Sequence, residues 1–202
     1  MNWLSVILFA IITGVYTGAI MLFPVLENTS FQHIGISYEW WVIFAVIVVV
    51  NCNKNWDAML KCFVFFLISQ PLVYIVEVVF GSLAFSQGLY YYTRIWLPAT
   101  FLTIPGGFIA YYCKKQNLIG SVILGIGNTI QCLLGLFYAE KAISTFPYHL
   151  LSAVICFVSM FIMSFYIQKE KKYRLISIIF PFVASAIIIA AVELSGLTFF
   201  GA

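Results

Sequence analysis

Three polar side chains interrupt an apolar segment of the sequence and could together bind a solute. Gln70, Tyr74 and Glu77 follow one another at i, i+4 and i+7. On an α-helix this spacing places an amide, a phenol and a carboxylate along one face. A charged group inside a membrane is costly, so such a face is expected to point toward protein or water. The spacing therefore predicts a polar binding surface.

Other polar residues could complete this surface from neighbouring segments. Arg94 begins a later apolar segment, where its guanidinium could pair with Glu77 or bind an anionic ligand. Asn128 and Gln131 share a helical face at i, i+3, and either join helices by hydrogen bonds or form a pocket with Gln70. The candidate substrate-binding residues are therefore Gln70, Tyr74, Glu77, Arg94, Asn128 and Gln131.

Prolines and glycines interrupt two of the predicted helices. Pro71 has no N–H, so the carbonyl of Leu67 loses its helical donor, and the side chain of Ser69 or Gln70 could replace it. The Pro-Gly-Gly run after residue 104 is a second weak point near mid-membrane, although it could equally allow two helices to cross closely. The predicted hinge residues are Pro71, Pro105, Gly106 and Gly107.

A Gly-x-x-x-Gly pattern lies in the first apolar segment. Gly14 and Gly18 recur at the spacing that lets helices approach closely. We expect them to form a helix-packing contact, within the chain, with a partner membrane subunit or with a second copy.

The sequence offers little to catalysis or metal binding. The two histidines, His33 and His149, belong to no compact ligand motif, and the five cysteines form no Cys-x-x-Cys pair. No catalytic residue, metal ligand or cofactor is predicted, so an enzyme is less favoured than a transporter.

Composition places the chain in a membrane. Hydrophobic residues make up 63% of the 202 residues and charged residues 8%, against ~25% charged in soluble domains. We predict an all-α polytopic membrane helix bundle, folded as a single domain over residues 1–202. Seven apolar segments of near-spanning length are expected, or six if the first or second lies at the interface. These segments are 3–25, 38–52, 58–80, 95–113, 117–138, 147–168 and 174–195.

Charges in the connections predict the orientation. Of the ten Lys and Arg residues, all but Arg94 and Lys141 fall in alternate connections, as expected for cytoplasmic loops. The N-terminus is therefore predicted inside and the C-terminus outside, in a bacterial-type cell membrane. Nucleic-acid binding is not indicated. Aromatic residues near the outer boundary form either an interfacial belt or a solute-binding vestibule: Tyr38, Trp40, Trp41, Tyr90, Tyr91, Tyr92, Trp96, Tyr138 and Tyr148.

No motif in the sequence identifies a family. The leading hypothesis is transport or binding of a small solute, in an outward-opening polar pocket between the third, fourth and fifth predicted spans. The main alternative is an accessory or structural subunit that binds a partner through its helices. An outward-facing membrane enzyme ranks third.

Overall fold

The computed structural model describes residues 1–27, 29–33, 37–144, 146 and 149–195. These residues form helices and no strand, which confirms the predicted all-α class. Among them, six helical segments are long and apolar enough to cross a membrane; the second includes residues 34–36, which lie outside the described part. The six are Trp3–Met21, Ser30–Val50, Asn55–Val79, Leu118–Ser144, Leu150–Ile167 and Lys171–Leu194.

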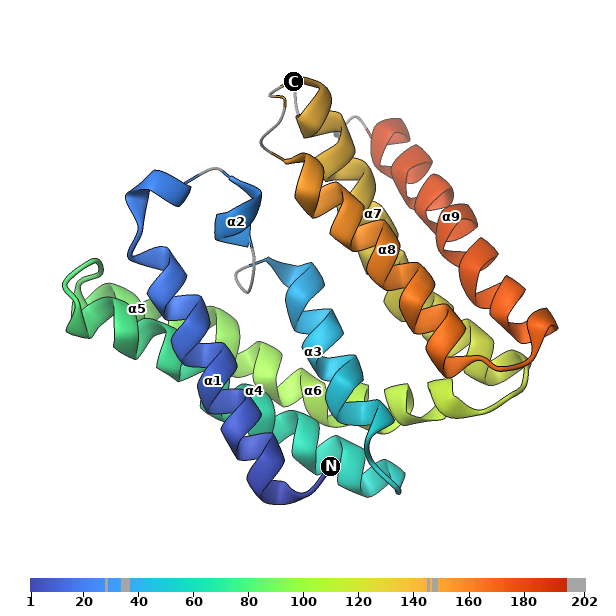
Figure 1. Cartoon of the computed structure of the whole chain (residues 1–202), viewed down its shortest axis with the longest axis horizontal. Coiled ribbons are helices and arrows are strands. Elements are labelled where there is room, and N and C mark those ends of the chain that lie inside the picture. Colours follow the sequence, from blue (N-terminus) through green and yellow to red (C-terminus); the bar gives the residue numbers. More distant parts are fainter. Residues whose placement is uncertain (28, 34–36, 145, 147–148, 196–202) are drawn as a thin grey trace. The chain divides into compact units, whose positions relative to one another are not determined.

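The chain divides into two compact units (Figure 1). The first comprises Met1–Glu27 and Phe31–Tyr111, and the second comprises Asn28–Ser30 and Tyr112–Ala202. The expectation of one domain over the whole chain stays a prediction.

The first unit is built around the long helix α4. Its elements are α1 (Trp3–Met21), η1 (Pro24–Leu26), α3 (Tyr38–Val50), α4 (Asn55–Val79), α5 (Phe85–Tyr91), η2 (Tyr92–Trp96) and α6 (Leu97–Ala110), with the short α2 (Ser30–His33) before α3. The predicted fourth span, 95–113, contains α6, which has only 14 residues. That helix is contiguous with the π-helical turn η2 and with α5.

Two glycines bring α1 close to α4. A Cβ atom added at Gly14 would lie 2.5 Å from the carbonyl oxygen of Ser69, and one at Gly18 would lie 2.7 Å from that of Val73. Real side chains essentially never approach backbone so closely. The Gly-x-x-x-Gly pattern thus lies at the α1–α4 contact of the first unit.

The contact between α4 and α6 depends on another small residue. Gly107 lies against α4, where an added Cβ would be 3.2 Å from the carbonyl oxygen of Ala58, whereas nothing lies within 4 Å of one at Gly106. The Pro-Gly-Gly run is therefore found at a helix crossing, with one of its glycines inside the contact. Whether Pro71, Pro105, Gly106 and Gly107 act as hinges stays a prediction.

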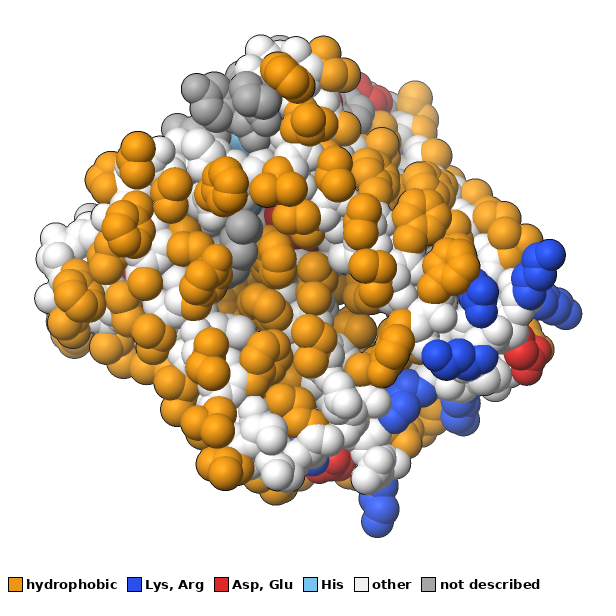
Figure 2. Space-filling view, viewed as in Figure 1, with side chains coloured by type: hydrophobic (Ala, Val, Ile, Leu, Met, Phe, Trp, Pro, Cys, Tyr) orange, Lys and Arg blue, Asp and Glu red, His pale blue; other side chains and the backbone are white. Residues whose placement is uncertain are grey.

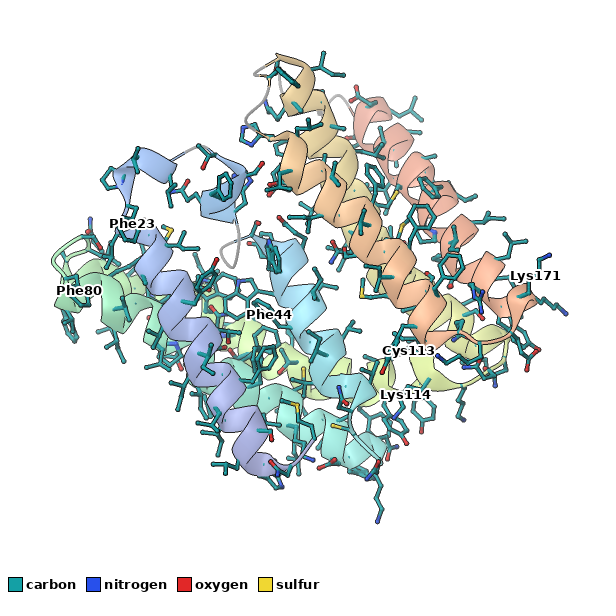
Figure 3. The ribbon with its side chains drawn as sticks, viewed as in Figure 1. Phe23, Phe44, Phe80, Cys113, Lys114 and Lys171 are labelled. Carbon is teal, nitrogen blue, oxygen red and sulfur yellow. The ribbon has the colours of Figure 1, made fainter. Side chains whose placement is uncertain are left out.

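Aromatic rings fill the core of the first unit. Phe44 of α3 contacts Phe9, Trp41 and Phe65, with ring centroids 5.5, 5.6 and 6.3 Å apart (Figure 3). Phe65 is fully buried. These rings hold α1 and α3 against α4, because large aromatic side chains bury the most apolar area per residue.

A buried lysine fixes the start of α4 against the start of α1. The Lys61 ammonium lies 2.8 Å from the Asp57 carboxylate and donates to the Met1 carbonyl oxygen at 2.7 Å. It also lies over the Trp3 ring, 5.6 Å from the centroid. Burial of this charge is thereby compensated by a partner and by hydrogen bonding.

The second unit takes over within η3 (Tyr111–Lys114) and contains α7 (Leu118–Ser144), α8 (Leu150–Ile167) and α9 (Lys171–Leu194). The central helix α7 packs against both α8 and α9. Gly125 accommodates the ring of Phe180, and Gly135 lies against Cys156. These two glycines therefore lie where α9 and α8 cross α7.

The helices of both units expose many large apolar side chains. Ile12, Ile75 and Phe101 in the first unit are 64%, 52% and 54% exposed, and Ile126 and Ile187 in the second are 56% and 64% exposed. Figure 2 shows apolar side chains over the helices of the visible face. Soluble monomers rarely expose apolar surface so widely, which is consistent with helices that lie in a bilayer.

Candidate functional site

A cavity of about 280 Å³ lies inside the first unit. The three polar residues of the predicted stripe all line it: Gln70, Tyr74 and Glu77. Their shared helical face therefore points into the same space, as their spacing requires. The remaining lining residues are Thr17, Met21, Trp41, Val73, Leu83, Tyr91 and Trp96.

Several elements position these side chains around α4. Helix α1 supplies Thr17 and Met21, α3 supplies Trp41, α5 supplies Tyr91 and the π-helical turn η2 supplies Trp96. The close approach of α1 to α4 sets one wall of the cavity. Short π-helical turns occur often at functional sites, and this one contributes Trp96 to the lining.

Gln70 is a deeply buried polar residue of the cavity. It is 2% exposed, and its amide nitrogen Nε2 is buried without a hydrogen-bond partner. The hydroxyl of Ser69 has none either. The idea that one of these side chains satisfies the carbonyl freed by Pro71 is therefore wrong, because the Gln70 amide faces the cavity instead. A buried donor left unpaired costs about 1–3 kcal/mol, and a ligand that accepted its hydrogen bond would recover that energy.

Glu77 places a carboxylate in the same cavity. The residue is 6% exposed, and its backbone carbonyl accepts hydrogen bonds from the backbone N–H and the hydroxyl of Ser82. The expected ion pair with Arg94 is not formed: Arg94 lies on the π-helical turn with its side chain exposed. The spacing of residues in the sequence did not predict this π-helical turn.

Four aromatic rings line the cavity. Trp41 and Trp96 have ring centroids 6.3 Å apart, and Tyr74 stacks on Tyr91 at 6.4 Å with an interplanar angle of 17°. Tyr38 lies against Trp96 from outside the lining, at 6.0 Å. Three of the rings predicted as an interfacial belt or a vestibule, Trp41, Tyr91 and Trp96, thus line a cavity.

Asn128 and Gln131 lie on α7, in the second unit. The Asn128 amide nitrogen donates to the Ser164 hydroxyl at 2.9 Å and to the Ser177 carbonyl oxygen at 3.3 Å. Both Asn128 and Gln131 are almost fully buried. The Asn128 amide thereby joins α7 to α8 and α9, and neither residue is among those that line the cavity.

Pro71 borders a second, apolar space. This groove of about 310 Å³ is lined by α4 and α5, and by Tyr92. Tyr74 lines both spaces, so the two adjoin at this residue.

Sequence reasoning missed four lining residues: Thr17, Met21, Val73 and Leu83. Thr17 lies beside Gly18 in the Gly-x-x-x-Gly pattern, so its position facing α4 could have been read from that motif. Met21 and Leu83 carry no such signal. Their place in the lining depends on how helices distant in sequence pack together.

No metal centre is visible at this site or elsewhere in the described ranges, where no three His, Cys, Asp or Glu side chains gather as ligands. Comparison with protein-family models, with curated proteins and with solved structures found no match for the chain.

Proposed function

We propose that the chain is a multi-pass protein of the cell membrane that binds a small solute in the first-unit cavity and takes part in its transport. The observation that carries this proposal is the pairing of an unpartnered buried amide, Gln70, with a nearly buried carboxylate, Glu77, in one aromatic-lined space. Solute sites are typically concave and largely apolar, with a few convergent polar groups. A volume of about 280 Å³ suits a ligand smaller than most drugs, whose sites span ~300–1,000 Å³.

We further propose seven passes, with the N-terminus in the cytoplasm and the C-terminus outside. Helices α5, η2 and α6 run without a break from Phe85 to Ala110, which at ~1.5 Å per residue exceeds the ~30 Å hydrocarbon core. This contiguous segment would supply the pass that α6 is too short to make. Reporter fusions after residues 54, 115 and 170 would be cytoplasmic under this topology, and an external reporter at any of them would contradict it.

A ligand screen on the purified protein tests the binding proposal. Thermal unfolding in maltoside detergent is measured against a panel of small metabolites, for the wild type and for Gln70→Ala and Glu77→Gln. We expect at least one compound to raise the unfolding temperature of the wild type and to lose that effect in both variants.

Matched controls replace the same residue types where they do not face the cavity. Gln87→Ala changes an exposed amide on α5, and Glu193→Gln changes an exposed carboxylate on α9. Both should respond to the compound as the wild type does. Two results would favour the alternative of an accessory subunit. One is a compound that still raises the unfolding temperature of the Gln70 and Glu77 variants, and the other is a compound whose effect is lost equally in the control variants.

A further inference from the structure

The cavity of the first unit contains a carboxyl group with no cation beside it. Glu77 is its one acidic lining residue, and no Lys or Arg lines it in the part of the chain that the structure describes. Arg94 is exposed on η2, and the Lys61 ammonium is engaged by Asp57 and by the Met1 carbonyl. A nearly buried carboxylate requires a counter-charge or a proton. The described protein supplies no counter-charge there.

The walls around this carboxylate are suited to a positive charge. Trp41, Tyr74, Tyr91 and Trp96 all line the space. The faces of aromatic rings carry negative partial charge, and they attract ammonium groups most strongly where water is excluded. Rings of this kind gathered around one carboxylate are how proteins recognise amines and quaternary ammonium groups. The same ring faces and carboxylate would repel an anion.

A second group in the cavity defines the other end of the ligand. The unpartnered Nε2 of Gln70 is a hydrogen-bond donor, so it calls for an acceptor oxygen. Gln70 and Glu77 lie two turns apart on α4, about 10 Å along the axis between their Cα atoms. A ligand that reaches both side chains therefore carries its charge and its oxygen a few bonds apart.

We propose that the solute is a small organic cation with an oxygen acceptor, such as an amino alcohol or a hydroxylated quaternary ammonium. Glu77 is its counter-charge, the four aromatic rings enclose the ammonium group, and Gln70 donates a hydrogen bond to the oxygen. This inference depends on the proposed solute-binding function and names the chemical class of the ligand.

Paired probes that differ only in charge test this assignment. Choline is compared with 3,3-dimethylbutan-1-ol, in which carbon replaces the charged nitrogen, and 4-aminobutan-1-ol with pentan-1-ol. Binding is measured by calorimetry and by quenching of tryptophan fluorescence, in maltoside detergent without ammonium lipids. We expect at least one cation to bind ten times or more tightly than its neutral counterpart.

Variants assign the charge preference to the cavity. Glu77→Gln should abolish the difference between the paired probes, whereas Glu77→Asp, which keeps the charge, should retain part of it. Trp96→Phe, which keeps a ring, should weaken cation binding without affecting the neutral probe. Each variant is first compared with the wild type by its unfolding temperature, which separates misfolding from lost binding. The affinity ratio of the paired probes for the wild type is a test that needs no variant.

The outcomes separate this inference from the proposed function. Equal binding of a cation and its neutral counterpart, or a preference unchanged in Glu77→Gln, would overturn the cation assignment. A neutral or anionic compound that binds in a Gln70-dependent way while neither cation binds would also overturn it, yet leave solute binding intact. A lipid headgroup could supply the same ammonium chemistry. Binding of short-chain phosphatidylcholine without free choline would support the cation assignment and identify a lipid source.

Discussion

Tyr74 of α4 stacks on Tyr91 of α5, with ring centroids 6.4 Å apart and planes inclined by 17°. Both residues of the pair line the polar cavity, and Tyr74 also lines the apolar groove. The Tyr74 ring therefore borders both a space that contains a carboxyl group and one lined by apolar side chains.

Removal of the Tyr74 ring should join the polar cavity and the apolar groove, both of which it borders. Tyr74→Ala is expected to lower the free energy of unfolding by about 3 kcal/mol, as for other large-to-small substitutions of aromatic residues, and to abolish ligand binding. Tyr74→Phe keeps the stacked ring and should retain most of the stability. Thermal unfolding and calorimetry measure both effects. Equal loss of stability and of ligand binding in the two variants would show that both properties depend on the Tyr74 hydroxyl and not on its ring.

Gln70→Met should make the ligand-free protein more stable. The side chains are similar in volume, and the change removes a buried donor that has no partner, which costs about 1–3 kcal/mol. The same variant should lose ligand binding. A rise in the unfolding temperature together with lost binding would mark Gln70 as a functional residue. A fall in the unfolding temperature would show instead that its amide supports the fold.

Gly14→Ala should separate α1 from α4. The added methyl would lie 2.5 Å from the Ser69 carbonyl oxygen, so the helices must shift, at a cost of about 1–3 kcal/mol. Gly106→Ala is the matched control, because nothing lies within 4 Å of its added methyl and alanine favours a helix over glycine by ~1 kcal/mol. Unfolding temperatures should fall for the first and stay equal or rise for the second. Equal changes in both would argue against the close α1–α4 contact.

Two buried thiols can report on the two units separately. Burial and the neighbouring Asp57 carboxylate raise the pKa of Cys52 to about 11, and burial raises the pKa of Cys113 to about 12. Since the thiolate is the reactive form, neither should react with a maleimide dye at neutral pH until its unit unfolds.

Variants that keep one of these cysteines, with the others changed to alanine, should show different midpoints of labelling on heating. In the Cys52 protein, Gly14→Ala should lower the midpoint, and in the Cys113 protein it should not. Coincident midpoints that shift together would show one cooperative domain.

His149 should make the second unit sensitive to acid. Burial and the nearby Lys141 ammonium hold the pKa of His149 below its ordinary value of 6.5. As pH falls below 6.5, the unfolded chain takes up this proton before the folded chain does, so stability is complete above 6.5 and declines toward the folded pKa. The unfolding temperature of the Cys113 protein, followed from about pH 8 to about pH 5, should fall less in His149→Gln. His33→Gln serves as the control and should keep the full dependence; an unchanged profile in His149→Gln would contradict the assignment.

The sequence predicted the parts of this structure that depend on local spacing. Apolar segments became helices, and the i, i+4, i+7 stripe of α4 lines one cavity because helix geometry alone brings its members together. Partners on other helices were harder to predict. The predicted Glu77–Arg94 pair is not formed, because Arg94 lies on an exposed π-helical turn. For Asn128 the sequence left two alternatives, hydrogen bonds between helices or a pocket with Gln70; its amide donates to Ser164 and Ser177, as the first alternative requires, and the second stays a prediction. Such contacts depend on packing between distant segments.

The π-helical turn from Tyr92 to Trp96 has a consequence for how this protein could change over generations. A π-helical turn holds one residue more than an α-helical turn, as if a single residue had been inserted into a regular helix. Deletion of one residue there would restore an unbroken helix and rotate everything before it by about 100° relative to α6. Tyr91 would then leave the wall that it shares with Tyr74 and Trp96. A lineage that lost this one codon would keep the membrane-spanning helices and lose the shape of the cavity.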